Sequence, residues 1–204
     1  GTAAAAVVAL AFALTTGPAA PAEGVRCAGT NVTVQGDDRA EVQSACRGAA
    51  AAVKFLASLG LDATTAAEMR IVKALPAIQG GTSAYGCKVK AENRIYVLTL
   101  SECGKLPLTP SLEVDAAVHR SLVAHEVAHH VAAANFRMAE PTTVAHEYIA
   151  YVTMFATMER EARERILAQY PGEGFESERE IGLTLYLMDP TRFGAYAYRH
   201  FIRP

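Results

Sequence analysis

The residues His125-Glu126-Val127-Ala128-His129 form an HExxH string, a motif that carries a specific chemistry. On a helix, two histidines four residues apart lie on one face, about 6 Å apart along the axis. Their imidazoles can converge on one zinc ion with bonds of about 2.0–2.1 Å. Glu126 follows the first histidine directly, so its carboxylate can reach a zinc-activated water and take its proton. The string predicts zinc ligands at His125 and His129, with Glu126 as general base.

A catalytic zinc ion needs a third protein ligand and an open fourth position. In the extended pattern HExxHxxGxxH, the glycine position is Ala132 and the third histidine position is Asn135, which excludes that pattern. A glutamate from a second helix is the alternative, and Glu147 lies 18 residues after His129. His146 stands beside it, but neighbours on a helix point about 100° apart, so only one of them can face the metal. We expect Glu147 as third ligand, with His146, a water or another residue as alternatives.

Two other histidines precede and follow the motif histidines. His119 is six residues before His125 and falls on a different helix face, which predicts a surface residue. His130 is rotated away from the zinc face, and we expect it to pack or to form a hydrogen bond.

The elements that must position the motif fall into two parts. The first part alternates strands with one helix: a strand over 31–34, a helix capped by Asp37 or Asp38 that ends near Gly60, a strand over 69–75, and a hairpin of 87–89 with 94–100. The second part is helical: 112–134, 142 to about 167, a helix to 187 that starts with a Ser177–Glu180 capping box, and a last helix to 201. This order predicts an α+β fold with a small, mainly antiparallel sheet followed by a helical half.

Composition favours a single folded domain over 24–204. The chain has 204 residues, of which 20% are charged, and its net charge is −2. Disordered chains combine low hydrophobicity with high net charge, and nucleic-acid binders normally carry a basic excess; neither applies here. We therefore expect no nucleic-acid partner and a monomer.

The first residues have the character of an export signal. Residues 3–14 are an uninterrupted apolar run, too short for a membrane span, which needs about 20 apolar residues. Ala20-Pro21-Ala22 fits a cleavage site with small residues. Residues 1–23 therefore read as the remnant of a signal peptide or as a disordered tail. The signal reading predicts an exported protein, periplasmic or secreted, without a membrane span in the mature chain.

The number of cysteines, four, also favours an exported protein. No Cys-x-x-Cys pair is present, so a thiolate metal site is not indicated. An even count behind an export signal predicts two disulfides, whereas four reduced cysteines would be expected in the cytosol. Of the three possible connectivities, the sequential one needs the shortest loops: Cys27 with Cys46, and Cys87 with Cys103 across the predicted hairpin.

Around the motif, over about residues 94–153, the chain resembles the gluzincins, the thermolysin-like zinc metallopeptidases, in a minimal single-domain form. The resemblance rests on HEVAH followed by the glutamate of HEYIAY. It implies that His125, His129 and Glu147 bind zinc, that Glu126 is the general base, and that the strand over 94–100 is the edge to which a peptide substrate adds.

The second motif departs from the NExxSD pattern common in that family, because Tyr151 stands where an acidic residue would orient a zinc histidine. The family also supplies a downstream His or Tyr that stabilises the oxyanion. Tyr196, Tyr198 and His200 are the candidates here.

These observations predict an exported zinc peptidase that hydrolyses peptide bonds by metal-activated water. Two other functions stay open. One is a zinc hydrolase acting on a different amide or ester, and the other is a non-catalytic relative that holds zinc for structure.

Overall fold

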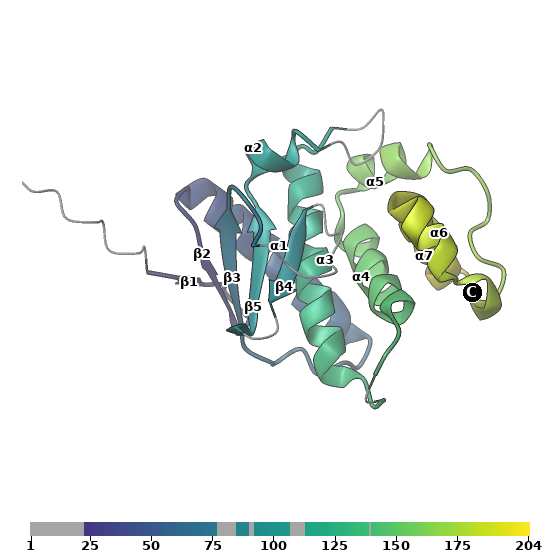
Figure 1. Cartoon of the computed structure of the whole chain (residues 1–204), viewed down its shortest axis with the longest axis horizontal. Helices are drawn as coiled ribbons and strands as arrows, with labels where there is room; N and C mark the ends of the chain where they lie inside the picture. Colours follow the sequence, from purple (N-terminus) through teal and green to yellow (C-terminus); the bar gives the residue numbers. More distant parts are fainter. Residues whose placement is uncertain (1–22, 77–84, 90–91, 107–112, 139) are drawn as a thin grey trace, which may run out of the picture.

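The computed structural model of the chain describes residues 23–76, 85–89, 92–106, 113–138 and 140–204 (Figure 1). The strands within these residues are β1 (Val25–Arg26), β2 (Val32–Gln35), β3 (Ala67–Val72), β4 (Gly86–Val89) and β5 (Arg94–Leu98). The helices are α1 (Arg39–Ser58), α2 (Leu100–Cys103), α3 (Ala116–Asn135), α4 (Thr143–Thr157), α5 (Arg160–Leu167), α6 (Leu183–Met188) and α7 (Pro190–Ile202). The fold is α+β. The strands of the sheet and α1 come first along the chain and the helical half follows, as the sequence predicts. The predicted signal segment over 1–23 lies outside the described residues, apart from Glu23.

The sheet is mixed, and the expectation of a mainly antiparallel sheet is wrong. Its strand order is β1-β2-β3-β5-β4. β1 pairs with β2 and β4 with β5 in antiparallel fashion, whereas β3 runs parallel to both β2 and β5. For β2 and β3 the physical reason is α1, because a crossover helix returns the chain to the start of the next strand and so makes that strand parallel. For β3 and β5 the reason is β4, which lies between them in the chain, runs antiparallel to β5 and takes the outer position in the sheet. The order also places β5 inside the sheet, so that β4, rather than the strand over 94–100, is the edge among the described strands.

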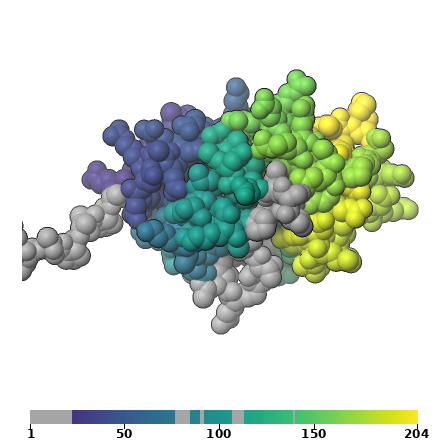
Figure 2. Space-filling model, turned by 90° about the horizontal axis from the view of Figure 1, so that it is seen from above, coloured from purple at the N-terminus to yellow at the C-terminus, as the bar shows by residue number. Residues whose placement is uncertain are grey.

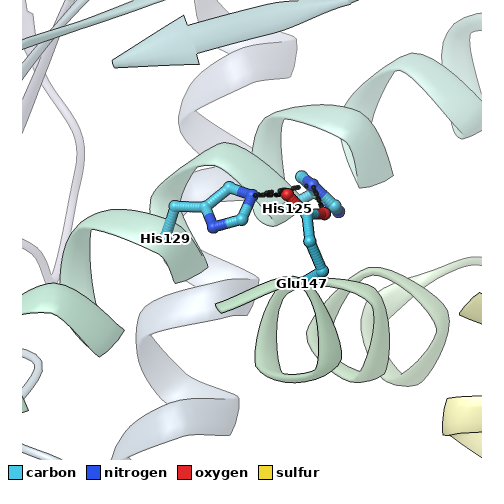
Figure 3. A group of neighbouring side chains, drawn as sticks. All are labelled: His125, His129 and Glu147. Atoms are coloured by element: carbon cyan, nitrogen blue, oxygen red, sulfur yellow. Dashed lines mark hydrogen bonds and ion pairs between the residues drawn. The ribbon is translucent and has the colours of Figure 1, made fainter. Parts of the chain in front are cut away.

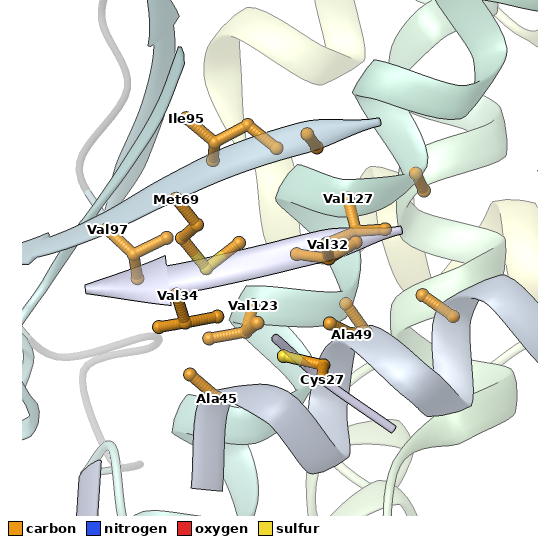
Figure 4. Close-up of a cluster of buried hydrophobic side chains, with 14 of the residues drawn as sticks. Cys27, Val32, Val34, Ala45, Ala49, Met69, Ile95, Val97, Val123 and Val127 are labelled. Atoms are coloured by element: carbon orange, nitrogen blue, oxygen red, sulfur yellow. The ribbon is translucent and has the colours of Figure 1, made fainter. Parts of the chain in front are cut away.

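One face of the sheet forms the core. Valines of β2, Met69 of β3 and Ile95 of β5 point toward α1 and α3, where Val123 and Val127 meet them (Figure 4). The opposite face is polar: Arg94 forms an ion pair with Glu68 at 2.9 Å across the parallel pair β3 and β5. Both α1 and α3 pack on the apolar face, and α3 lies between the sheet and α4.

The helical half packs on α3 through α4. Figure 2 shows the purple-to-teal first part and the green-to-yellow last part side by side in one body. Asp38, Asp115 and Thr142 cap α1, α3 and α4 by accepting hydrogen bonds from backbone N–H groups of the first turn. These caps fix where each helix starts and therefore which side chains face one another.

Two expected helix boundaries are wrong. The helix expected from 142 to about 167 is divided into α4 and α5 by Met158, whose backbone is extended and whose side chain is buried. Arg163 donates to the carbonyl oxygens of Phe155 and Met158, both at 3.3 Å, which satisfies backbone groups freed by the break. The capping box of Ser177 is also absent, because residues 178–180 form a 3₁₀ turn and α6 begins only at Leu183.

The cysteines confirm one predicted disulfide and refute the other. Cys27 and Cys46 are bonded and tie the start of the sheet to α1. Cys87 and Cys103 are free and buried. The predicted hairpin does form, but the chain leaves the sheet after Leu98 and turns into α2, where the Cys103 thiol lies 3.7 Å from the Leu98 carbonyl oxygen. Cys87 lies on β4, where it is paired with Tyr96 of β5.

No helix formed by the described residues combines the length and the apolar character that a membrane crossing requires.

Candidate metal centre

Helix α3 is buried on nearly every side, which decides what its polar residues can do. Most of its residues from Val118 to Ala132 are buried between the sheet, α1 and α4. A helix apolar all round is typical of a protein interior. His125 and Glu126 lie in this interior, exposed by only 9% and 6%. Buried imidazole and carboxyl groups are costly unless something uses their polar atoms.

Three side chains from two helices converge beside α3. His125 and His129 project from α3 toward Glu147 of α4, as Figure 3 shows. The two Nε2 atoms lie 3.0 Å apart. The Glu147 carboxylate lies 3.6 Å from each of them, with Oε2 toward His125 and Oε1 toward His129. We call this group the His-His-Glu centre.

The spacing of the centre fits a tetrahedral cation. Zinc bonds of about 2.0–2.1 Å at tetrahedral angles place neighbouring ligand atoms about 3.3–3.4 Å apart. The two Nε2 atoms lie 3.0 Å apart, and each lies 3.6 Å from a different oxygen of Glu147, all close to that value. Two imidazole nitrogens and one carboxylate oxygen are also a donor set that catalytic zinc sites use. The residues present therefore fit a zinc ion with one position left for water or substrate.

Of the two predicted third ligands, Glu147 is the one that meets the histidines. His146 points elsewhere: its ring packs edge-on against Phe136, with centroids 4.7 Å apart, and lies 6.1 Å from the ring of His129. The separation follows from the helix, since adjacent residues of α4 diverge by about 100°.

Burial shifts the pKa of each ionisable group in the centre, and that of Glu126 beside it, in the direction that favours the neutral form. Burial lowers the pKa of His129 to about 4, with a smaller effect from His146, and lowers the pKa of His125 well below its usual range. Burial raises the pKa of Glu147 to about 7. It raises the pKa of Glu126 to about 8, helped by the nearby charge of Glu147. The neutral imidazole is the form of histidine that can bind a metal ion, and a divalent cation would favour the ionised form of the carboxylates.

Glu126 lies beside the centre without belonging to it. Its carboxyl group rests against Gly86 of the edge strand β4: a β-carbon on Gly86 would come 2.6 Å from Cδ and 2.7 Å from Oε1. No pattern in the sequence singles out Gly86. Glu126 thus contacts the edge strand β4 and is near enough to Glu147 to respond to its charge.

Tyr151 makes an aromatic contact with His125, one of the candidate ligands. It stands four residues after Glu147 and is one helical turn along α4. Its ring packs edge-on against the His125 imidazole, with centroids 4.6 Å apart. The Nδ1 atom of His125 is buried without a hydrogen-bond partner within the described residues. His125 is therefore oriented by packing rather than by the acceptor that metal-binding histidines usually have.

The three predicted oxyanion residues make their contacts away from the centre. The Tyr196 hydroxyl lies 3.3 Å from the Pro171 carbonyl oxygen, to which it donates, and accepts a hydrogen bond from Arg192. The other two also have partners outside the centre. Tyr198 stacks on Phe155, and His200 Nδ1 lies 2.7 Å from the Tyr148 hydroxyl.

The phenol that does reach the centre is Tyr186 of α6, which sequence reasoning missed. Burial raises the pKa of its phenol, and the nearby charges of Glu147 and Glu126 raise it further. Nothing in the stretch Leu183–Met188 marks Tyr186 in advance, because the contact depends on how α6 folds back onto α4.

The expectations for His119 and His130 have different outcomes. His119 is buried, and the Leu98 carbonyl oxygen lies 2.8 Å from its Nε2, so the expectation of a surface residue is wrong. The reason is that α3 is covered on all sides. His130 forms the expected hydrogen bond, with Lys88 Nζ 3.0 Å from its Nδ1.

Fold and site together define an α+β protein with a candidate metal centre held between two adjacent helices. The chain belongs to the Family of unknown function (DUF6639), which matches residues 32–204. The match runs from β2 to the end of the chain and includes the whole His-His-Glu centre. Neither a curated protein nor a solved structure matches the sequence significantly.

Proposed function

We propose that this protein is a zinc-dependent hydrolase that cleaves peptide bonds. The observation that carries the proposal is the convergence of His125, His129 and Glu147: the two Nε2 atoms lie 3.0 Å apart, and each lies 3.6 Å from one of the two Glu147 oxygens. The buried carboxyl group of Glu126 is near enough to Glu147 to respond to its charge. A structural zinc site uses four protein ligands, whereas three ligands and an adjacent base are typical of a catalytic site. The resemblance of the motif to the gluzincins agrees with this assignment.

Each residue has a defined part in the proposed reaction. His125, His129 and Glu147 hold the ion, which when bound supplies Lewis acidity toward a carbonyl group and makes a water molecule acidic near neutral pH. Glu126 would accept a proton from the attacking water at its carboxylate and would donate that proton to the leaving amine. Its burial keeps bulk water from competing for the proton and places the group where its pKa responds to nearby charge.

The edge strand supports a peptide as substrate. β4 pairs only with β5 among the described strands, so its other edge offers backbone groups to an extended chain. Gly86 of this strand touches Glu126. A peptide added along β4 would therefore pass close to the proposed base.

We also propose that the protein acts outside the cytoplasm. The disulfide between Cys27 and Cys46 supports this location, because such bonds persist in oxidising compartments.

The decisive experiment combines metal analysis with one isosteric substitution. The purified protein should hold about one equivalent of zinc after supplementation and should cleave a labelled unfolded protein. A chelator should abolish cleavage, and zinc should restore it. Glu126→Gln should keep the zinc and lose turnover, because the amide cannot accept the proton. Glu113→Gln, at an exposed glutamate, is the matched control and should change neither.

The outcomes separate the competing functions. Full activity of Glu126→Gln would refute the role of the base. A protein that takes up no metal would refute the proposal entirely, and tight binding of iron instead of zinc would change the reaction class. Zinc binding without peptide cleavage would favour a hydrolase of another amide or ester, or a non-catalytic zinc protein.

A further inference from the structure

The ring of Tyr151 contacts both a candidate metal ligand and helix α7, which packs alongside α4 (Figure 1). It lies edge-on to the His125 imidazole, with ring centroids 4.6 Å apart. It also lies edge-on to Phe193 of α7, with centroids 6.1 Å apart. Gly194, the next residue of α7, is buried against the same tyrosine ring. Tyr151 therefore connects α7 to the His-His-Glu centre.

The contact between Gly194 and Tyr151 leaves no room for a side chain on α7. A β-carbon on Gly194 would come 2.7 Å from Cγ of Tyr151, 2.9 Å from Cε1 and closer still to Cδ1. Carbon atoms in favourable contact are about 3.5–4.0 Å apart, so the ring would have to move by about 1 Å. Rotation of the ring about its own axis would not relieve the contact, because Cγ lies on that axis. The absence of a side chain at Gly194 thus fixes where the ring can lie.

The orientation of His125 depends on this ring. Within the described residues, the Nδ1 atom of His125 is buried without a hydrogen-bond partner, so no acceptor holds the imidazole. Its other ring contact among these residues is His129, with centroids 4.7 Å apart, and His129 is itself a candidate ligand. The aromatic support from outside the centre therefore comes from Tyr151.

We propose that Tyr151 is a positioning residue, whose ring holds the His125 imidazole in the direction that metal binding requires, and that Gly194 sets the place of this ring. The proposal rests on the metal site of the proposed function. It adds a contribution from α7, which carries neither the HExxH motif nor a ligand. Groups that orient a metal-binding histidine typically change metal affinity by about 10–100-fold when they are removed.

The first test removes the ring or only its hydroxyl. Tyr151→Ala should lower zinc affinity, measured by chelator competition, by about 10–100-fold. Tyr151→Phe keeps the ring and should retain the affinity. Tyr148→Ala is the matched control, because Tyr148 also joins α4 to α7, but its ring lies against His200, 5.8 Å away, instead of a candidate ligand. It should leave zinc affinity unchanged.

A second test reaches the centre from α7 without altering Tyr151. Gly194→Ala adds one methyl group that must displace the ring, so it should also lower zinc affinity. Gly182→Ala is the control, because its β-carbon would meet the Glu180 carbonyl oxygen at 3.7 Å, an ordinary contact. Thermal unfolding of the metal-free proteins shows which variants fold, and Gly194→Ala decides the question if Tyr151→Ala does not fold.

The visible spectrum of bound cobalt(II) separates positioning from a loss of stability. The absorption of this ion depends on how its ligands are arranged around it. Tyr151→Ala and Gly194→Ala should change the spectrum of the cobalt-loaded protein. Tyr148→Ala and Gly182→Ala should not change it, even where the melting temperature falls equally.

The results distinguish this proposal from the proposed function. If the unaltered protein binds zinc, and folded Tyr151→Ala and Gly194→Ala bind it as tightly with the same cobalt spectrum, the positioning role is refuted and the zinc site stands. An equal loss of affinity in Tyr148→Ala or in Tyr151→Phe would also refute the role of the ring. If the unaltered protein binds no zinc, both proposals fail together.

Discussion

Gly86 of the edge strand lies so close to the carboxyl group of Glu126 that a side chain at position 86 would displace that group. A β-carbon there would come within 2.6 Å of Cγ and Cδ of Glu126. The atoms it would meet belong to the far end of a side chain, whereas the backbone at this point is ordinary strand. Gly86 therefore leaves space for the proposed base, and a larger residue would displace that base before it disturbed the fold.

Gly86→Ala should lower peptide hydrolysis by about 100-fold, because a displacement of about 1 Å in a reacting group can cost this much. Zinc content should be unchanged, since Glu126 is not one of the three ligands. Metal analysis and cleavage of a labelled unfolded protein measure the two effects separately. Gly104→Ala is the control, because its nearest neighbour would be the Leu100 carbonyl oxygen at 3.4 Å, an ordinary contact. A Gly86→Ala protein with the full rate would show that the carboxyl group need not stay where it lies.

The identity of the third ligand can be tested with two neighbouring substitutions on α4. Glu147→Ala removes a direct ligand and should weaken zinc binding by more than the 10–100-fold typical of an indirect contact. His146→Ala should leave the affinity almost unchanged, because its ring packs against Phe136 outside the centre. Competition with a coloured chelator measures both. The opposite ranking would make His146 the ligand.

Zinc affinity should depend on pH with the slope of one proton. Burial raises the pKa of Glu147 to about 7, so below that pH the ligand must lose a proton before it binds. Burial lowers the pKa of His129 to about 4 and that of His125 further, so neither imidazole competes for protons above pH 5. The affinity should therefore rise about tenfold per pH unit up to about pH 7 and then level off.

The measurement is best made on Glu126→Gln, in which the neighbouring carboxyl group cannot titrate. A slope of two or three protons between pH 5 and 7 would mean that the histidines keep their ordinary pKa. An affinity independent of pH would contradict the raised pKa of Glu147.

The centre itself could be predicted from the sequence because its spacing is local. The positions of His125, Glu126 and His129 follow from one helix, and the path to Glu147 needs only one turn of the chain. Helix α1 could be anticipated for the same reason, since Asp38 caps it where the sequence places a cap. Tyr186 depends instead on the return of α6 to α4, some forty residues later along the chain, and no local pattern encodes that contact.

The errors in the sheet and the cysteines have the same origin. Alternating residues identify a strand but not its neighbour, so the parallel pairing of β3 with β2 and β5 was hidden in the connections. The proximity of Cys87 and Cys103 in sequence suggested a bond across the hairpin. The turn into α2 after Leu98 removes Cys103 from that hairpin. Likewise, the sequence identifies the helical face that carries His119 but not the strand end that covers this face, where the Leu98 carbonyl oxygen meets the imidazole.

Thiol counting should show one disulfide and two protected thiols. Burial raises the pKa of Cys87 to about 11 and that of Cys103 to about 12, so neither should react with a thiol reagent at pH 8 in the native protein. Denaturation without a reductant should expose two thiols per chain, and reduction should then give four. A count of zero before reduction would mean that Cys87 and Cys103 also form a disulfide.

Replacing both Cys27 and Cys46 by alanine should lower the free energy of unfolding by about 3 kcal/mol, because the bond closes a loop between residues 19 apart in sequence. Denaturant unfolding followed by circular dichroism measures this loss, and an unchanged midpoint would mean that the bond does not stabilise the fold.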